Sequence, residues 1–124
     1  EVFLLSKIVS HFKRCATQME LGNLDVWRDF SDVRAVVTAY RGLIQAKAVG
    51  RIFNVCSGQA TSLREVISMM EAIAGYRIDV QVNPAFVRAN EVRTLTGSAD
   101  RLKVVLPEWT PRPLSETLAW MFRT

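Results

Sequence analysis

Apolar residues recur at helical spacing in several parts of the chain. The clearest case begins at Ser62-Leu63-Arg64-Glu65, a capping box in which Ser62 and Glu65 can each accept a backbone N–H. Apolar residues follow at three- and four-residue steps up to Ala74, and Gly75 is well placed to end the helix. The pattern therefore predicts a helix between Ser62 and Gly75.

Four other stretches also carry a helical stripe. Residues 31–45 predict a long helix, with Ser31 as its N-cap. Ser98 can cap a short helix that Pro107 ends, and Pro113 opens a last helix. The N-terminal stripe has a ragged start and consists of Leu4, Ile8, Phe12, Cys15 and Met19.

Two segments predict strands. Residues 51–56 are rich in β-formers without strict alternation, which is typical of a parallel strand covered on both faces. Ile78, Val80 and Val82 alternate with polar residues and predict a half-buried strand. A parallel strand at 51–56 needs partners, and few other strands are evident. Either the sheet is very small, or its other strands lie in a missing part of the protein.

Composition and charge exclude several classes of protein. The chain has 124 residues, of which 49% are apolar and 23% charged, so we expect a folded domain with one core. No apolar run is long enough to span a membrane, and residues 1–7 lack the basic start of a signal peptide. The net charge of +4 is scattered, so we expect no nucleic-acid partner. Cys15 and Cys56 predict reduced core cysteines of a cytoplasmic protein.

The sequence lacks the usual signatures of catalysis and metal binding. It has no GxGxxG or P-loop after a strand and no GxSxG elbow. Neither Tyr40 nor Tyr76 has a lysine four residues on, as a proton-transfer pair would. His11 is the only histidine and cannot complete a zinc set with two distant cysteines. We therefore predict no catalytic residue and no metal site in this chain.

One group of charged residues could bind a ligand. Arg28 precedes a strong helix, and Arg88 and Glu91 lie in a loop after a strand. Arginines at the ends of elements suit diphosphate recognition, because the planar guanidinium can pair with two oxygens at once. A carboxylate in a loop can accept both hydroxyl groups of a ribose. The alternative is that Arg28, Arg88 and Glu91 are ordinary surface charges.

Six segments in chain order carry a resemblance to a known family. They are FLLSKI at 3–8, LGNLDVWRDFSDVR at 21–34, FNVCSG with SLRE at 53–65, RANEV at 88–92, GSADRL at 97–102 and WTPRPLSETL at 109–118. They resemble motifs of the extended short-chain dehydrogenases that modify nucleotide sugars. More narrowly, they resemble the branch of GDP-mannose 4,6-dehydratases and GDP-6-deoxy-4-keto-mannose reductases, and the VCSG stretch favours the reductases.

The resemblance implies roles for individual residues. By position in the motifs, Arg28 and Arg88 would bind the diphosphate of a nucleotide sugar, Glu91 would hold the ribose, and Lys7 would lie at the nucleotide. Three positions depart from the family pattern: Ala89 replaces a Pro, Ser98 replaces an Asp, and Arg93 replaces a Pro of some relatives and could add a phosphate contact.

The resemblance also implies a fold and a domain organisation. The fold would be α/β, the C-terminal part of an NAD(P)-binding Rossmann-type extended short-chain dehydrogenase, mostly helical with a few short strands. Residues 1–124 would be a single C-terminal fragment: the substrate-binding lobe plus the helix at 31–45 and the strand at 51–56 of the Rossmann domain. The N-terminal half would hold NAD(P) and the catalytic Tyr-xxx-Lys pair. We therefore expect this chain alone to bind no cofactor.

The implied parent enzyme is an NAD(P)-dependent oxidoreductase acting on a GDP-sugar, with a GDP-4-keto-6-deoxy-mannose reductase as the first candidate. A hydride would pass from the cofactor to a 4-keto sugar, and a tyrosine would supply the proton. Three alternatives stay open: a GDP-mannose 4,6-dehydratase, a stand-alone module that binds nucleotide sugars, and a helical interaction domain. We expect the chain alone to be inactive and to self-associate through exposed strand and helix faces.

Overall fold

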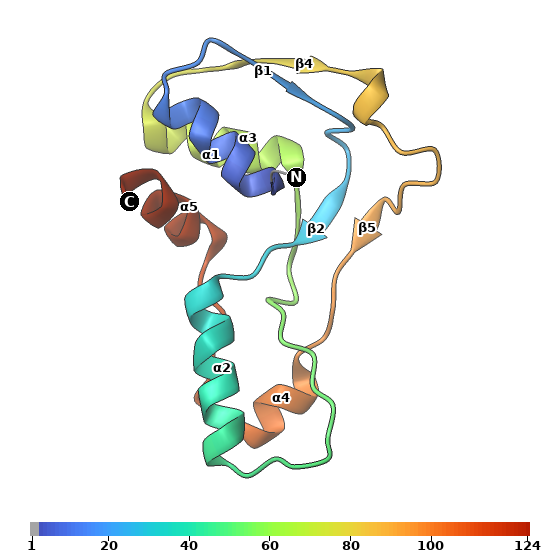
Figure 1. Cartoon of the computed structure of the whole chain (residues 1–124), viewed down its shortest axis with the longest axis vertical. Helices are drawn as coiled ribbons and strands as arrows, with labels where there is room; N and C mark the ends of the chain where they lie inside the picture. Colours follow the sequence, from blue (N-terminus) through green and yellow to red (C-terminus); the bar gives the residue numbers. More distant parts are fainter. Residues whose placement is uncertain (1–2) are drawn as a thin grey trace.

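A computed structural model describes residues 3–124, so Glu1 and Val2, the start of the segment compared with a signal peptide, lie outside the described residues. The chain forms an elongated molecule with helices at both ends, two short strands (β2 and β5) between them, and two more (β1 and β4) along the outer edge of one end (Figure 1). The elements in chain order are α1 (Leu4–Lys13), β1 (Gln18–Leu21), β2 (Trp27–Asp29), α2 (Val33–Gln45), β3 (Ala60–Ser62), α3 (Leu63–Ala74), β4 (Asp79–Val82), the 3₁₀ turn η1 (Pro84–Phe86), β5 (Thr94–Leu95), α4 (Asp100–Val105) and α5 (Leu114–Arg123).

The larger hydrophobic cluster lies between α1, α3 and α5, with β1 and β4 beside them (Figure 1). Ile8, Phe12, Val66, Met70 and Leu118 are among its fully or almost fully buried side chains. Burying side chains of this size stabilises each by about 1.5–3 kcal/mol relative to exposure. This cluster therefore fixes the three helices against one another.

The predicted ends of α3 are confirmed. The side chain of Ser62 accepts a hydrogen bond from the amide of Glu65, and the Glu65 carboxylate accepts one from the amide of Ser62. Gly75 ends the helix in the left-handed conformation, with φ of 80°, which costs glycine little. The local sequence is thus sufficient to define this helix.

A second, smaller cluster lies at the other end of the molecule, so the prediction of a single core was wrong. Ala35 and Ala39 on α2 pack with Leu102 on α4 and with Trp109. The two alanines leave room for the indole of Trp109, whose Nε1 donates to the carbonyl of Ala35 at 2.9 Å. The second cluster has only five buried residues, so most of the buried apolar side chains remain in the first cluster.

The strands form two small sheets. β1 and β4 pair in parallel, and β2 lies between antiparallel β3 and parallel β5. The predicted strand at 78–82 is confirmed as β4. Met19, predicted on the first helix, instead lies on β1, because α1 ends at Lys13 and Cys15 adopts a positive φ of 53° that breaks the helix.

Residues 51–56, predicted to be a parallel strand, form no strand in the structure. The physical reason is the absence of a partner, since none of the strands in residues 3–124 pairs with this segment. Phe53 and Val55 pack against the second cluster, whereas Ile52 is 80% exposed. The segment therefore presents part of its apolar surface to solvent.

The apolar stripe predicted on residues 31–45 is confirmed as a helix, but much of it faces outward. Val33, Val37, Tyr40 and Ile44 are 58–78% exposed along one face of α2. Ala35 and Ala39 supply the buried face instead. Cys15 is exposed, so its predicted core position was wrong, while Cys56 is half-buried; both are free thiols.

Asp32, not the predicted Ser31, caps α2. Its buried carboxylate accepts hydrogen bonds from the amide and guanidinium of Arg34 and from the hydroxyl of Thr117 on α5. The Arg34 guanidinium stacks on Trp120, 4.1 Å from the ring centroid. Hydrogen bonding to Arg34 outweighs burial and holds the pKa of Asp32 well below its usual range. Asp32 therefore joins the start of α2 to α5.

Replacement of Asp32 tests this junction. Asp32→Ala should lower the free energy of unfolding at pH 7 by about 2–4 kcal/mol, because it leaves Arg34 and Thr117 without their acceptor. The folded-state pKa lies below the unfolded value of about 3.9, so the stabilisation is complete above that value and declines as the pH falls below it. Urea unfolding should show the difference between wild type and variant shrink by about 1 kcal/mol at pH 3. A difference independent of pH would contradict this role for the carboxylate.

Candidate functional site

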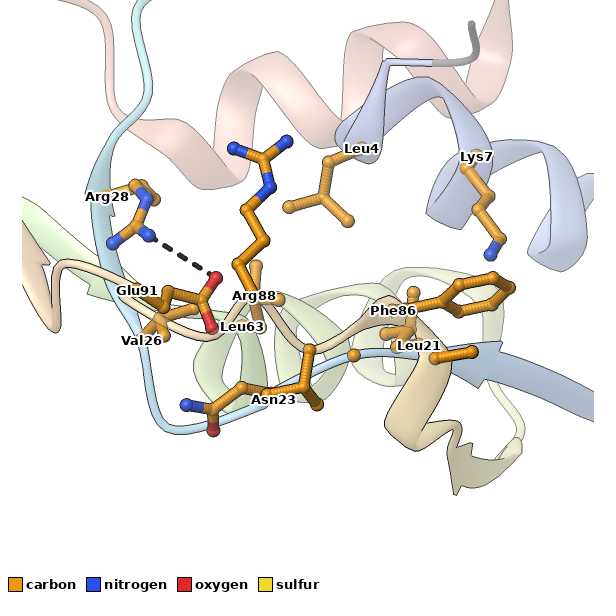
Figure 2. Close-up of a pocket in the computed structure, with 13 residues that line it drawn as sticks. Leu4, Lys7, Leu21, Asn23, Val26, Arg28, Leu63, Phe86, Arg88 and Glu91 are labelled. Atoms are coloured by element: carbon orange, nitrogen blue, oxygen red, sulfur yellow. Dashed lines mark ion pairs between the residues drawn. The ribbon is translucent and has the colours of Figure 1, made fainter.

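A pocket of about 550 Å³ opens beside β2, between α1 and the loop that follows β4 (Figure 2). All four residues proposed from the sequence line it: Lys7 from α1, Arg28 from β2, and Arg88 and Glu91 from the loop. Its remaining walls are mostly apolar, and they consist of Leu4, Leu21, Gly22, Asn23, Val26, Leu63, Ala85, Phe86 and Val87. The fold thus gathers residues from separate segments into one charged cavity.

Strand pairing places Arg28 in the pocket. β2 pairs with β5, so Arg28 lies opposite Leu95, and the amide of Trp27 donates to the carbonyl of Arg93 at 2.7 Å. The Arg28 guanidinium donates to the carbonyls of Trp27 and Arg93 at 2.8 and 3.4 Å. These contacts hold a half-buried cation at the wall of the pocket.

Glu91 faces Arg28 across the pocket wall, as Figure 2 shows, with 3.6 Å between Oε1 and the guanidinium. Its other oxygen, Oε2, is buried and has no hydrogen-bond partner among residues 3–124. A buried polar atom without a partner is unfavourable, and a turn of the Glu91 side chain would bring this oxygen to a ligand donor in the pocket. Glu91 can therefore accept hydrogen bonds from hydroxyl groups of a bound molecule.

Arg88 and Lys7 extend the positive charge of the pocket. Arg88 is exposed, and its side chain rises between Arg28 and Leu4 in Figure 2. Lys7 donates from Nζ to the carbonyl of Glu20 at 2.6 Å and lies 4.9 Å from the centroid of the Phe86 ring. Together with Arg28, they give the pocket three cations and one carboxylate, a composition that suits an anionic ligand bearing hydroxyl groups.

Arg93 is placed differently from the sequence-based suggestion. Its guanidinium lies 5.3 Å from the centroid of the Trp27 indole, and Arg93 does not line the pocket. Its carbonyl, by contrast, accepts hydrogen bonds from both Trp27 and Arg28. Arg93 therefore supports the site through its backbone.

Sequence reasoning did not identify Gly22 and Phe86 as parts of the site. A Cβ at Gly22 would lie 2.7 Å from the carbonyl oxygen of Phe86, so only glycine allows the two backbones to approach this closely. This approach packs the loop that carries Arg88 and Glu91 against the end of β1. The available signal was the Gly22-Asn23 pair directly after an apolar residue.

The chain carries no glycine-rich dinucleotide motif, and its described residues hold no cluster of metal-binding side chains. None of the six glycines occurs in a GxGxxG turn between a strand and a helix, so no backbone cradle for a pyrophosphate of that type is present. In residues 3–124, no group of three metal-binding side chains comes together. Nor does any helix in that part of the chain have the length and apolar character needed to cross a membrane.

Gly22→Ala should loosen the loop after β4. The new methyl group would overlap the backbone of Phe86, and we expect a loss of stability of about 1–3 kcal/mol together with faster amide hydrogen exchange over residues 84–91. Gly42→Ala is the matched control, because its methyl would meet the flexible side chain of Leu106 at 2.8 Å, in the second cluster. Unchanged exchange in the 84–91 loop of the Gly22 variant would contradict the proposed role of this glycine.

Comparisons with known proteins show the family to which the chain belongs. A family model described as GDP-mannose 4,6 dehydratase matches residues 2–121. GDP-6-deoxy-D-mannose reductase of Pseudomonas aeruginosa is 40% identical over 87 residues, which are 70% of this chain and 29% of that protein. The chain thus spans less than a third of the length of this relative.

Two solved structures are also similar to this chain. A candidate epimerase from Burkholderia cenocepacia matches 98% of this chain and 40% of its own at 54% identity, with a TM-score of 0.95. The Pseudomonas aeruginosa protein RMD, solved in complex with NADPH, matches 98% of this chain and 41% of its own at 30% identity, with a TM-score of 0.87.

These findings confirm the predicted fold class, an α/β fold of the Rossmann-type extended short-chain dehydrogenases, mostly helical and with a few short strands. They also confirm the resemblance that the six sequence segments carry. The chain belongs to the GDP-mannose 4,6-dehydratase family.

Proposed function

We propose that this chain is the nucleotide-sugar-binding part of an NAD(P)-dependent GDP-sugar oxidoreductase. The observation that carries the proposal is the convergence of Lys7, Arg28, Arg88 and Glu91 on one pocket. In this proposal the two arginines hold the diphosphate, and the Glu91 carboxylate accepts hydrogen bonds from the ribose. Lys7 lies at the nucleotide, next to the ring of Phe86.

The contacts of the site support this assignment of roles. Arg28 is already oriented by two backbone carbonyls, so little side-chain freedom is lost when a diphosphate pairs with it. Arg88 is exposed and can close on the same group from the loop. The Arg28–Glu91 pair keeps the carboxylate beside the cation, where the ribose and the diphosphate of one nucleotide would lie next to each other.

The parent enzyme is, in this proposal, a GDP-4-keto-6-deoxy-mannose reductase. The 40% identity to the reductase of Pseudomonas aeruginosa favours reduction. A GDP-mannose 4,6-dehydratase is the second candidate, because the matching family model carries that description. The two reactions differ in chemistry that the residues of this pocket do not perform, so the pocket is compatible with both.

We further propose that a cofactor-binding half covers the outward face of α2 and the segment at 51–56. Val33, Val37, Tyr40 and Ile44 form an exposed apolar stripe on α2, and Ile52 in the segment at 51–56 is also exposed. Relatives matched over 98% of this chain are about two and a half times as long, so they contain further structure that could pack here. NAD(P) would bind in that half, and the chain alone would not turn over a GDP-sugar.

Calorimetry with GDP and an Arg88→Ala variant tests the site. We expect saturable binding to the wild-type chain, weakened in the variant by about 1.5–3 kcal/mol because a hydrogen bond to a charged group is lost. Arg123→Ala, at the exposed end of α5 and outside the pocket, is the matched control and should bind like wild type. Equal affinity of wild type and the Arg88 variant would contradict the role of Arg88.

The exposed face of α2 predicts self-association of the chain alone. Light scattering at increasing concentration should show species larger than a monomer, because an apolar stripe of this kind is unfavourable in water. The double variant Val37→Lys and Ile44→Lys should shift the population toward monomer while leaving GDP binding unchanged, since neither residue lines the pocket. A wild-type chain that is monomeric at all concentrations would overturn this prediction.

A further inference from the structure

Asp29 follows Arg28 on β2 and does not line the pocket. Its carboxylate collects hydrogen bonds from two distant segments. Oδ1 accepts from the amide and the hydroxyl of Ser57, at 2.9 and 2.6 Å. Oδ2 accepts from the amide of Gly58 at 2.9 Å and the hydroxyl of Thr96 at 3.2 Å, with a longer contact of 3.5 Å to the amide of Gly97.

These two segments belong to the two neighbours of β2. Residues 57–58 lead into β3, which pairs with β2 on one side, and residues 96–97 follow β5, which pairs with it on the other. β3 has three residues and β5 only two, so their backbone pairing alone is weak. The Asp29 carboxylate therefore joins all three strands at one end of the sheet.

The position of β5 decides where the partners of Arg28 lie. Arg93, directly before β5, offers the carbonyl that accepts from Arg28, and Glu91 stands 3.6 Å from the same guanidinium. Because successive side chains of a strand leave opposite faces, Asp29 can hold the sheet together from the face opposite to the pocket. The carboxylate thus acts on the site without touching a ligand.

The surroundings of the Asp29 carboxylate favour its ionised form. Burial alone would raise its pKa, but the hydrogen bonds from Ser57, Gly58 and Gly97 outweigh burial and lower it. Hydrogen bonds to an ionised acceptor are about twice as strong as bonds between neutral groups. A neutral amide in the same place would be a weaker acceptor and would direct its NH₂ group at one set of donors.

We propose that Asp29 is a positioning residue of the candidate nucleotide site, holding β3 and β5 against β2 so that Arg28, Glu91 and the Arg93 carbonyl keep their places. The inference rests on the proposed function, which assigns Arg28 and Glu91 to the nucleotide. It adds a residue from outside the pocket on which the geometry of the pocket depends.

The test compares Asp29→Asn with Asp32→Asn in the same chain. Both variants neutralise an aspartate that accepts several hydrogen bonds, but Asp32 joins α2 to α5 away from the pocket. GDP affinity by calorimetry should fall about tenfold in Asp29→Asn, a change of about 1.4 kcal/mol, and stay close to wild type in Asp32→Asn. Amide exchange of the free protein should be faster at Trp27, whose partner is the Arg93 carbonyl, in Asp29→Asn only.

A milder variant covers the case in which Asp29→Asn fails to fold. Thr96→Val keeps the shape of the side chain and removes a single hydrogen bond to Asp29. It should weaken GDP binding about threefold, as expected for loss of one modest hydrogen bond.

The outcomes separate this inference from the proposed function. If wild type binds GDP and the Asp29 and Thr96 variants bind equally well, the inference is wrong and the proposed function stands. If wild type does not bind GDP, the proposed function fails. Amide exchange then decides the positioning role by itself: faster exchange at Trp27 in the Asp29 variant alone supports it, and equal exchange in both variants overturns it.

Discussion

The pairing of β2 with β5 is the constraint on which the candidate site depends. It is a short contact, with Trp27 opposite Thr94 and Arg28 opposite Leu95. Because β5 ends the long loop that starts after β4, this pairing returns the loop to the strand that carries Arg28. Arg28 and Glu91 are far apart in the sequence, and this pairing brings them face to face.

Polar side chains support this arrangement where strand pairing is too short to do so. Asp29 joins β2 to the segments beside β3 and β5, and Asp32 joins the start of α2 to α5. Both carboxylates lie in the segment at 21–34 that resembles a family motif. The same short stretch therefore supplies Arg28, which lines the pocket, and two carboxylates that join β2 and α2 to neighbouring elements.

The two hydrophobic clusters give the two ends of the molecule different characters. The larger cluster packs three helices and forms the base of the pocket through Leu21 and Leu63. The smaller one holds α2 against α4 and leaves the apolar stripe of α2 exposed. The open stripe is separate from the pocket, since none of its residues lines it.

The sequence by itself determined those features whose causes are local. The capping box and Gly75 define α3 because their hydrogen bonds and backbone conformation involve neighbouring residues. The motifs around Arg28, Arg88 and Glu91 led to the prediction of these three residues as a binding site, and the structure places them around one pocket. What those residues bind stays a prediction.

Tertiary structure alone decided the features that depend on distant partners. Residues 51–56 have the composition of a strand but form none, because a strand exists only where another strand offers hydrogen bonds. Met19 follows the stripe of a helix yet lies on β1, where β4 pairs with it. Asp32 caps α2 through the amide of Arg34, and its further hydrogen bond from Thr117 of α5 is a tertiary contact that no local pattern predicts. The contact of Gly22 with Phe86, and the position of Glu91 beside Arg28, likewise arise from packing between segments that the sequence separates by more than 60 residues.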